Sequence, residues 1–479
     1  MSRTEGRVEE TGVERVSGGY PPDITLESLA PEPLLGREYQ DRPEDVHERL
    51  RRRHGAVAPV DLLGVPVWLV LNYAEALHIL QNDAMWPKGM QYWRARNEGR
   101  VPADWPVAPA LEADNTMARG GADHARYRAA WDAALKPFQD PGHPRTRRLK
   151  DNIRRTANEL VMLLAQEGRS GVADLAARFS RPLPLMVAGE LLGVSGPQSE
   201  RTLMDIWRIL DAGPDSAVAS ARVHTAMVAL AEEKRRRPGE DFPSYMLAAQ
   251  PRLTSSALAH ELTMLMGMIS DHAGILIANA VVEIITGDGR ARASLSAGMI
   301  RETVNHVVLR KPPLANFMPR FPLRDQRLGA YIIRAGEPVW IATAATHADL
   351  RSAAGTSADR ATSTRAHLSW GAGPRQCPAP ARELATTITT LALECLLEHF
   401  ATLELAVPAD QLPWRSSPFV RGLRSLPIRY ELRADYEIPS PDRAADDERA
   451  ASEEQAAPAS TLRRLLAGTV TGTVDPYSF

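Results

Sequence analysis

The chain has 479 residues, 44% hydrophobic and 24% charged, which is enough apolar material for a large buried core. Its formal net charge of -2 excludes the basic surface expected of a nucleic-acid or anionic-membrane binder. Its two cysteines cannot build a disulfide framework, nor a four-cysteine zinc or iron–sulfur site. Abundant helix formers and sparse aromatic residues favour a mainly α-helical protein.

Both ends of the chain differ in character from its middle. Residues 1–24 are polar and charged, lack the apolar segment of a signal peptide, and are expected to form a disordered arm. Residues 437–479 are rich in Ala, Asp, Glu, Arg, Ser and Pro, so this tail is expected to be mostly disordered. A docking peptide for a partner is the alternative for the tail. Residues 25–436 then form the folded domain, and no internal repeat is present.

The folded part begins with a short amphipathic helix near Pro43. Residues 58–71 predict two short strands around a Gly-Val-Pro turn, and residues 73–81 predict a helix. A second small strand zone is expected at residues 326–342. Apolar residues at helical spacing predict further helices at Tyr127–Leu135, Lys150–Gln166, Leu183–Leu192, Ser199–Leu210, Val223–Arg236, Leu258–Thr286, Met299–Leu309 and Arg382–Leu397.

The longest apolar run extends from about Leu262 to Ile285 and carries Asp271 and His272 near its middle. A charge at mid-bilayer would be costly in a membrane-spanning helix. We therefore interpret the run as a long buried helix and expect a soluble, cytoplasmic protein with no membrane insertion.

A stretch around one cysteine carries the strongest chemical signal, and it reads Trp-Gly-Ala-Gly-Pro-Arg-Gln-Cys-Pro from Trp370 to Pro378. Glycines let the backbone pass close to a flat cofactor, and loop N–H groups that point at the sulfur of Cys377 favour its thiolate form. An iron–thiolate site needs such a loop. A buried free cysteine after a turn is the alternative. Cys395 lies at helical spacing with apolar residues and is expected to be part of the core.

The order of these elements, together with the cysteine loop, closely resembles the cytochrome P450 superfamily, in its soluble bacterial, actinobacterial form. The resemblance covers residues 23–436 and implies a mainly α fold, with small β-sheets near the N-terminal part and after the Pro-Pro turn. The family loop reads Phe-Gly-x-Gly-x-His/Arg-x-Cys-x-Gly/Ala. Here its positions hold Trp370, Gly371, Gly373, Arg375, Cys377 and Ala379.

The resemblance implies a haem domain over residues 25–436 that holds haem b, iron protoporphyrin IX. Cys377 would be the proximal thiolate ligand, and such a thiolate pushes electron density toward the iron. Arg375 would pair with a haem propionate, because a guanidinium matches carboxylate geometry. Trp370 would pack beside the thiolate, with Gly371 and Gly373 shaping the loop.

Three further residues would hold propionates if the resemblance extends to them. His124 and Arg128 are four apart and would share one helix face. Arg320 follows the Pro312-Pro313 turn at about the distance usual in the family. A solvated helix face and a surface arginine are the alternatives for these positions.

The long apolar helix departs from the family's small-Gly-x-acid-Thr motif, whose acid and threonine deliver protons during oxygen activation. Asp271 fills the acid position, but His272 replaces the threonine and Ile269 replaces the glycine. The distortion of this helix over the haem is therefore expected to change. His272 could relay protons, lie between substrate and iron or ligate iron. The alternative is a histidine that points away and is hydrogen-bonded in the core.

The short helix before the Pro-Pro turn lacks the family's Glu-x-x-Arg pair, which anchors the cysteine loop. His306 and Leu309 occupy those two positions, with Glu302 one turn early and Arg310 one residue late. The weakened motif places the chain nearest to relatives that lack this pair. An irregular stretch with few aromatic residues is expected at residues 348–364, where it would alter packing against a redox partner.

These features predict a haem-thiolate monooxygenase that uses oxygen and takes electrons from ferredoxin and ferredoxin reductase. Its substrate is expected to be a small lipophilic or natural-product molecule of secondary metabolism. The expected pocket segments are residues 264–276, 314–318 and 85–93. The alternatives are non-standard haem chemistry, such as peroxide use, radical coupling or rearrangement, and a regulatory or scaffolding role.

Overall fold

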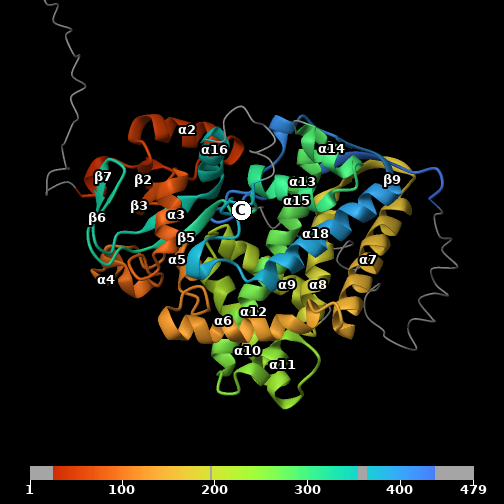
Figure 1. Cartoon of the computed structure of the whole chain (residues 1–479), viewed down its shortest axis with the longest axis horizontal. Helices are drawn as coiled ribbons and strands as arrows, with labels where there is room; N and C mark the ends of the chain where they lie inside the picture. Colours follow the sequence, from red (N-terminus) through yellow and green to blue (C-terminus); the bar gives the residue numbers. More distant parts are fainter. Residues whose placement is uncertain (1–24, 195–196, 288, 354–363, 437–479) are drawn as a thin grey trace, which may run out of the picture.

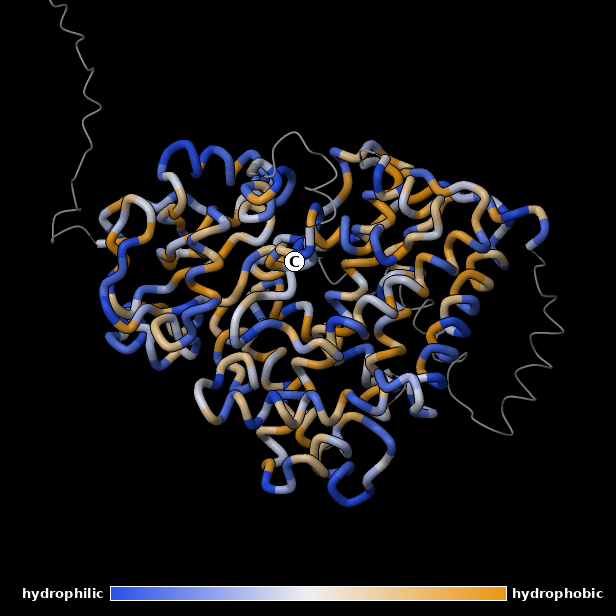
Figure 2. Tube along the Cα trace, in the orientation of Figure 1, coloured by the Kyte–Doolittle hydropathy of each residue, from blue (hydrophilic) through white to orange (hydrophobic). Residues whose placement is uncertain are grey.

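The computed structural model describes residues 25–194, 197–287, 289–353 and 364–436. Figure 1 shows a lobe of small sheets on one side and a larger helical body on the other. Hydrophobic residues follow the strands of the lobe and the inner helices, while many outer turns are hydrophilic (Figure 2). The mainly α fold with small sheets is confirmed. The predicted arm and tail lie outside the described residues.

Small sheets bring distant parts of the chain together. The strands β2 and β3 pair antiparallel, and β3 pairs parallel with β8, with Trp68 opposite Val339. The end of the second predicted strand zone, β8, therefore joins the first zone in one five-stranded sheet of order β1-β2-β3-β8-β5. Other described strands form a three-stranded sheet of order β4-β10-β9 and a hairpin of β6 and β7. The strand bounds are β1 Glu32–Pro33, β2 Val57–Asp61, β3 Pro66–Val70, β4 Ser170–Asp174, β5 Asn316–Arg320, β6 Gln326–Leu328, β7 Tyr331–Ile333, β8 Val339–Ala342, β9 Phe400–Leu405 and β10 Pro427–Leu432.

The turn between β2 and β3 lies slightly earlier than predicted. Leu62 and Val65 close it with reciprocal backbone hydrogen bonds. Leu63 and Gly64 have φ values of 54° and 85°, the pattern of a type I′ hairpin turn. Pro66, which was expected in the turn, is the first residue of β3.

The helical body contains all the helices predicted from periodicity, with small shifts of their ends. The elements that were not predicted are α1, α4, α5, α11, α14, α16, β1, β4, β5, β9 and β10. The α-helices are α1 Arg37–Asp41, α2 Pro43–His54, α3 Tyr73–Gln81, α4 Arg94–Asn97, α5 Ala108–Leu111, α6 Gly121–Leu135, α7 Pro144–Ala165, α8 Pro182–Leu192, α9 Pro197–Leu210, α10 Ser216–Arg236, α11 Phe242–Ala249, α12 Ser255–Met266, α13 Gly274–Thr286, α14 Arg290–Ser296, α15 Ile300–Arg310, α16 Thr343–Ala353 and α18 Ala379–His399. Shorter 3-10 or π turns are η1 Glu27–Leu29, η2 Met90–Tyr92, η3 Lys136–Phe138, η4 Ala176–Ser180, η5 Gly267–Ala273, η6 Gly373–Arg375 and η7 Ala409–Gln411.

One long central helix is formed by α12, the π-helical segment η5 and α13. Among the described helices it alone is long and apolar enough to cross a membrane, but 78% of its most apolar window is buried in protein. It is therefore the core helix that the sequence predicted. A Cβ on Gly274 would lie 2.8 Å from the Ser180 carbonyl oxygen, so the glycine permits close packing against η4. The helix is distorted by a π segment, which holds Asp271 and His272. Whether this distortion differs from that of relatives stays a prediction.

Candidate active site

The cysteine loop is closed by its own backbone. The Cys377 amide donates to the Trp370 carbonyl at 2.7 Å, and the Gly371 amide donates to the Leu368 carbonyl at 2.7 Å. A Cβ on Gly373 would lie 2.6 Å from the carbonyl oxygen of Leu80, and Gly373 has a φ of 68°. Glycine is therefore required where the loop contacts the end of α3.

The Cys377 thiol lies just before α18 in a poorly solvated place. Burial raises the pKa of Cys377 to about 11, although the nearby Arg382 and Arg128 cations act to lower it. The free thiol is thus neutral near pH 7, and a coordinated metal cation would be needed to deprotonate it.

Two of the predicted propionate arginines converge on an aspartate that the sequence analysis missed. Arg320 Nη1 lies 2.5 Å from Asp83 Oδ1, and Arg375 donates through Nε to the same oxygen. The side chains of Arg320 and Arg375 are 1% and 4% exposed. Arg320 Nη1 also donates to the Trp86 carbonyl at 3.0 Å, while Arg320 Nε makes no hydrogen bond with a described residue. Asp83, which is far from both arginines along the sequence, therefore fixes the positions of their side chains.

Cationic and imidazole groups surround this pair. Burial lowers the pKa of His124 to about 4, and the Arg375 cation adds to the shift. Burial, reinforced by Arg320 and Arg375, also lowers the pKa of Lys88 well below its ordinary value. The structure thus brings His124, Arg320 and Arg375 into one cluster, to which it adds Asp83 and Lys88.

Arg128 lies one turn after His124 on α6 and reaches the cysteine loop. Its Nη1 donates to the Gln376 carbonyl at 2.7 Å, directly before Cys377. The predicted shared helix face is present, since both side chains act near the loop. In this structure, however, the contact of Arg128 is with backbone.

Asp271 on the long helix is held by a cation from the C-terminal part of the chain. Arg415 Nη1 donates to Asp271 Oδ1 at 2.6 Å, and the same guanidinium donates to both carboxylate oxygens of Asp211 at 2.8 and 3.1 Å. Asp271 is 3% exposed and Arg415 is 4% exposed. Burial raises the pKa of Asp211, with Arg415 opposing the shift. Asp271 Oδ2 remains without a hydrogen bond to any described residue.

His272 has two buried ring nitrogens, and neither makes a hydrogen bond of good geometry to a described residue. Burial lowers its pKa, while the Asp271 carboxylate and the Gly267 carbonyl oppose that shift. The imidazole is therefore neutral near pH 7, and it retains one donor and one acceptor for a group outside the described protein.

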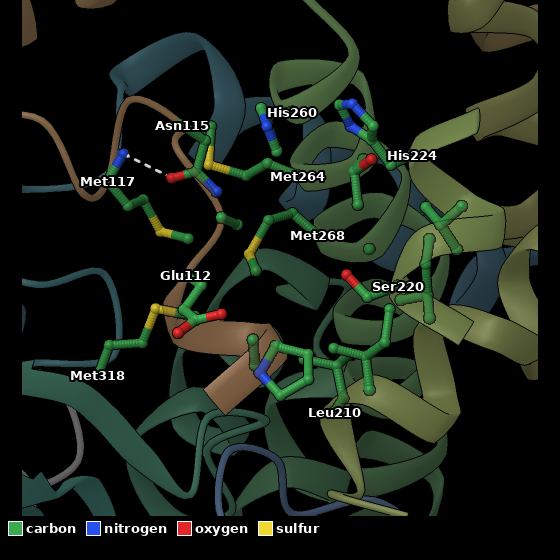
Figure 3. A pocket seen from close by; sticks show the side chains of 18 of the residues that line it. Glu112, Asn115, Met117, Leu210, Ser220, His224, His260, Met264, Met268 and Met318 are labelled. Atoms are coloured by element: carbon green, nitrogen blue, oxygen red, sulfur yellow. Dashed lines mark hydrogen bonds between the residues drawn. The ribbon is translucent and has the colours of Figure 1, made fainter. Parts of the chain in front are cut away.

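A cavity of about 260 Å³ lies between the long helix, α9, α10 and the segment that joins α5 to α6. Figure 3 shows that Met117, Met264, Met268 and Met318 project into it from three separate parts of the chain. The predicted pocket segments 264–276 and 314–318 thus both contribute. Segment 85–93 does not line this cavity. Its residues line a space of about 20 Å³ that shares Met117 and Met318, and two other cavities of about 420 and 330 Å³. The lining from residues 109–117 and from α9 and α10 was missed.

A buried carboxylate fixes one wall of this cavity. Glu261 on α12 accepts hydrogen bonds from the Thr116 amide at 2.8 Å, the Thr116 hydroxyl at 2.7 Å and the Trp131 indole at 2.7 Å. Burial raises the pKa of Glu261 to about 7, and these donors reduce the shift. Thr116 directly precedes Met117, whose carbonyl accepts from Arg375 Nη1 at 2.7 Å. The cavity wall and the arginine cluster are therefore joined.

Comparison with known proteins agrees with this architecture. No protein-family model matches the chain. It is 28% identical over 394 residues to 2-hydroxy-5-methyl-1-naphthoate 7-hydroxylase of Streptomyces carzinostaticus, covering 80% of this chain and 94% of that protein. It is 30% identical over 406 residues to cytochrome P450 107B1 of Saccharopolyspora erythraea, covering 81% and 95%. The chain belongs to the cytochrome P450 family.

Solved cytochrome P450 structures share the fold as well. CYP154C4 from Streptomyces sp. W2061 superimposes with a TM-score of 0.71 at 26% identity, covering 81% of this chain and 95% of that chain. As a cytochrome P450 of the monooxygenase type, this protein uses a haem-iron cofactor and acts on a small molecule.

The residues at the site fit a haem. Cys377 offers a buried thiol, and its neighbouring charged groups are cations that would stabilise a thiolate. Arg320 Nε is a buried donor without a partner among the described residues, as a propionate-facing guanidinium requires. The two open nitrogens of His272 suit a site whose remaining groups come from bound molecules. The protein groups therefore match an iron porphyrin in both charge and hydrogen bonding.

Proposed function

We propose that residues 25–436 form a single haem domain that binds haem b through Cys377 as the proximal thiolate. Arg320, Arg375 and His124 would lie on the propionate side. The carrying observation is Cys377, a half-buried residue whose thiol is poorly solvated, at the end of a glycine loop that is held against α3 and followed by α18. Bound haem iron supplies the activation of oxygen, and the protein supplies orientation, exclusion of water and protons.

The remaining loop residues and Arg128 would act on the thiolate side. Trp370 accepts the Cys377 amide through its carbonyl and packs against the apolar core. Gly371 and Gly373 adopt positive φ values of 72° and 68°, which allow the tight loop. Arg128 would hold the loop through the Gln376 carbonyl and stabilise the thiolate by its charge.

Asp271 and His272 are our candidates for proton delivery. Oδ1 of Asp271 is taken by Arg415, so Oδ2 is the atom that can accept a proton from water and release it toward the substrate side. The neutral His272 ring can accept at one nitrogen and donate at the other, which is what a relay requires. Its second role would be to bound the space in which substrate lies.

The substrate class we infer is a small lipophilic molecule of the natural-product kind. Four methionines give the cavity an apolar, adaptable lining, and such side chains accommodate irregular shapes. The relative from Streptomyces carzinostaticus is named as a hydroxylase of 2-hydroxy-5-methyl-1-naphthoate, a small aromatic acid. Electrons would come from a ferredoxin and its reductase in the cytoplasm. The relatives do not favour peroxide use, radical coupling, rearrangement or a scaffolding role.

Spectra of the purified protein test this function. Reduced protein with carbon monoxide should give the red-shifted band of a thiolate-ligated haem, and Cys377→Ser should lose it. Turnover with NADPH, ferredoxin reductase and ferredoxin should then give an oxygenated product from a panel of lipophilic natural products. A wild-type carbonyl complex without the thiolate band would contradict the assignment of Cys377. Product formation with peroxide alone, and none with the electron chain, would contradict the monooxygenase cycle.

A further inference from the structure

The cysteine loop lacks the anchor that the Glu-x-x-Arg pair gives in relatives, and the structure shows where the cations of α15 go instead. His306 Nε2 lies 3.3 Å from Glu283 Oε1, and Arg310 Nε lies 3.0 Å from the same oxygen. Lys311 Nζ lies 3.7 Å from Glu283 Oε2. Because Glu283 belongs to α13, these contacts bind α15 to the long helix. Two other residues of α15 reach the stretch before the cysteine loop: Glu302 pairs with Arg365, and Asn305 Oδ1 lies 3.3 Å from His367 Nε2.

His347 on α16 forms a buried connection between α15 and the cysteine loop. His347 is completely buried, with an exposed fraction of 0%. Its Nδ1 lies 3.0 Å from the Leu309 carbonyl oxygen in the last turn of α15. Its Nε2 lies 2.9 Å from the backbone nitrogen of Leu368. A single imidazole therefore joins the end of α15 to the beginning of the cysteine loop.

The two contacts fix the tautomer of the ring. The Leu368 amide can only donate, so Nε2 of His347 must accept, and Nδ1 carries the proton given to the Leu309 carbonyl. Burial lowers the pKa of His347 to about 3, so the ring is neutral near pH 7, in agreement with the tautomer that the two contacts require. A carbonyl in the last turn of a helix has no partner within the helix, and the Leu309 carbonyl accepts from His347 Nδ1 and, at 3.2 Å, from Arg351 Nη1.

The connection continues through backbone to the thiolate. Leu368 is 2% exposed, and its carbonyl accepts the Gly371 amide at 2.7 Å. The Trp370 carbonyl in turn accepts the Cys377 amide at 2.7 Å. A second hydrogen bond, from the Ser369 hydroxyl to the Val308 carbonyl at 2.9 Å, lies beside the first and fixes the loop against α15.

We propose that His347 is a positioning residue for the haem-thiolate loop, a neutral substitute for the absent Glu-x-x-Arg ion pair. It acts through Leu368 on the position of Cys377 and touches neither substrate nor cofactor. The proposal rests on the proposed role of Cys377 as the iron ligand. Together with the Ser369–Val308 hydrogen bond and the Glu302–Arg365 ion pair, it explains how a family member without the Glu-x-x-Arg pair keeps the loop at a fixed distance from α15.

His347→Leu removes both hydrogen bonds at similar side-chain volume, while His347→Gln keeps an amide that can donate and accept. His47→Leu is the matched control, because His47 is also buried, at 3% exposed, but belongs to α2, away from the loop. The first readout, on the reduced holoenzyme with carbon monoxide, is the rate at which the thiolate band gives way to the band of thiolate-free haem. We expect His347→Leu to raise this rate about tenfold or more, as the loss of buried hydrogen bonds predicts. His347→Gln should recover most of the difference, and His47→Leu should leave the rate near that of wild type.

The second readout does not require a thiolate-ligated haem. Amide hydrogen exchange of the peptide that covers residues 368–377 should accelerate in His347→Leu and not in His47→Leu. Equal exchange and equal band stability in His347→Leu and wild type would overturn the proposal. A wild type without the thiolate band, but with faster loop exchange in His347→Leu, would overturn only the proposed ligand role of Cys377 and would leave the loop anchor standing.

Discussion

Glu261 allows a pH-dependent stability effect to be calculated from the structure. Its pKa rises from an ordinary 4.5 to about 7 because the carboxyl group is buried, and its hydrogen-bond donors offset only part of that rise. Between these two values the unfolded chain has lost the Glu261 proton while the folded protein keeps it. By linkage, stability falls as pH rises through this window. Compared with a side chain that does not titrate, Glu261 lowers the free energy of unfolding by about 0.8 kcal/mol at pH 5 and by about 3.4 kcal/mol at pH 8.5.

Glu261→Gln removes this cost because an amide does not titrate. The variant loses an acceptor for the Trp131 indole, but that loss is the same at every pH and cancels in a comparison between pH values. The difference in the free energy of unfolding between variant and wild type should therefore shift in favour of the variant by about 2.5 kcal/mol from pH 5 to pH 8.5. For a domain of about 400 residues, this gain corresponds to a melting temperature change of about 3 °C.

The assay is a thermal scan of wild type and variant at both pH values and one scan rate. Glu232→Gln, at an exposed position on α10, is the control and should follow wild type at both pH values. A melting-temperature difference between Glu261→Gln and wild type that is equal at pH 5 and pH 8.5 would refute the reasoning. It would mean that Glu261 is ionised throughout, or that its surroundings are wetter than the structure indicates.

Three further substitutions test other parts of the site. Asp83→Asn removes the carboxylate that both arginines contact, so they become available to a haem propionate. Haem transfer to excess apomyoglobin should slow by roughly fivefold, which corresponds to about 1 kcal/mol for a partly exposed pair. Faster transfer would show that Asp83 stabilises the holoprotein instead. Arg415→Met leaves two buried carboxylates unpaired and should cost about 3–5 kcal/mol in denaturant unfolding, so an unchanged midpoint would contradict the buried pairing with Asp271. Gly373→Ala should lower the haem-to-protein ratio, because the added Cβ would meet the backbone of Leu80 and Gln81. Gly64→Ala is the control, since Gly64 also has a positive φ but its Cβ would enter open space. Equal ratios in both variants would argue against the close packing at Gly373.

The cysteine loop was predictable because its signal is local. Glycines, arginine and cysteine stand at fixed spacing within nine residues, and backbone conformation over such a distance follows closely from residue type. The long helix was equally clear from its apolar length. In contrast, α16 has small and polar residues without a strong apolar period, and it was expected to be partly irregular. The structure instead keeps residues 343–353 helical, and the rest of the expected irregular stretch, residues 354–363, lies outside the described residues.

The partners of the predicted residues were not predictable from sequence. Asp83 is 237 residues away from Arg320, and Arg415 is 144 residues away from Asp271. Neither acid nor arginine carries a spacing that distinguishes it from the many other charged residues of the chain. Their pairing depends on how the sheets and helices pack, and only the folded structure shows which carboxylate each buried guanidinium meets.

The methionine lining of the cavity has a consequence for the lifetime of the enzyme. Thioether sulfur is readily oxidised, and Met117, Met264, Met268 and Met318 surround the cavity that we propose for the substrate. Each sulfoxide would add a polar, chiral group to an apolar wall and weaken the retention of lipophilic molecules. We therefore expect the enzyme to lose activity gradually when oxygen is reduced without oxidation of the substrate, because the methionines of its own cavity become oxidised. Methionine sulfoxide reductases would reverse this damage.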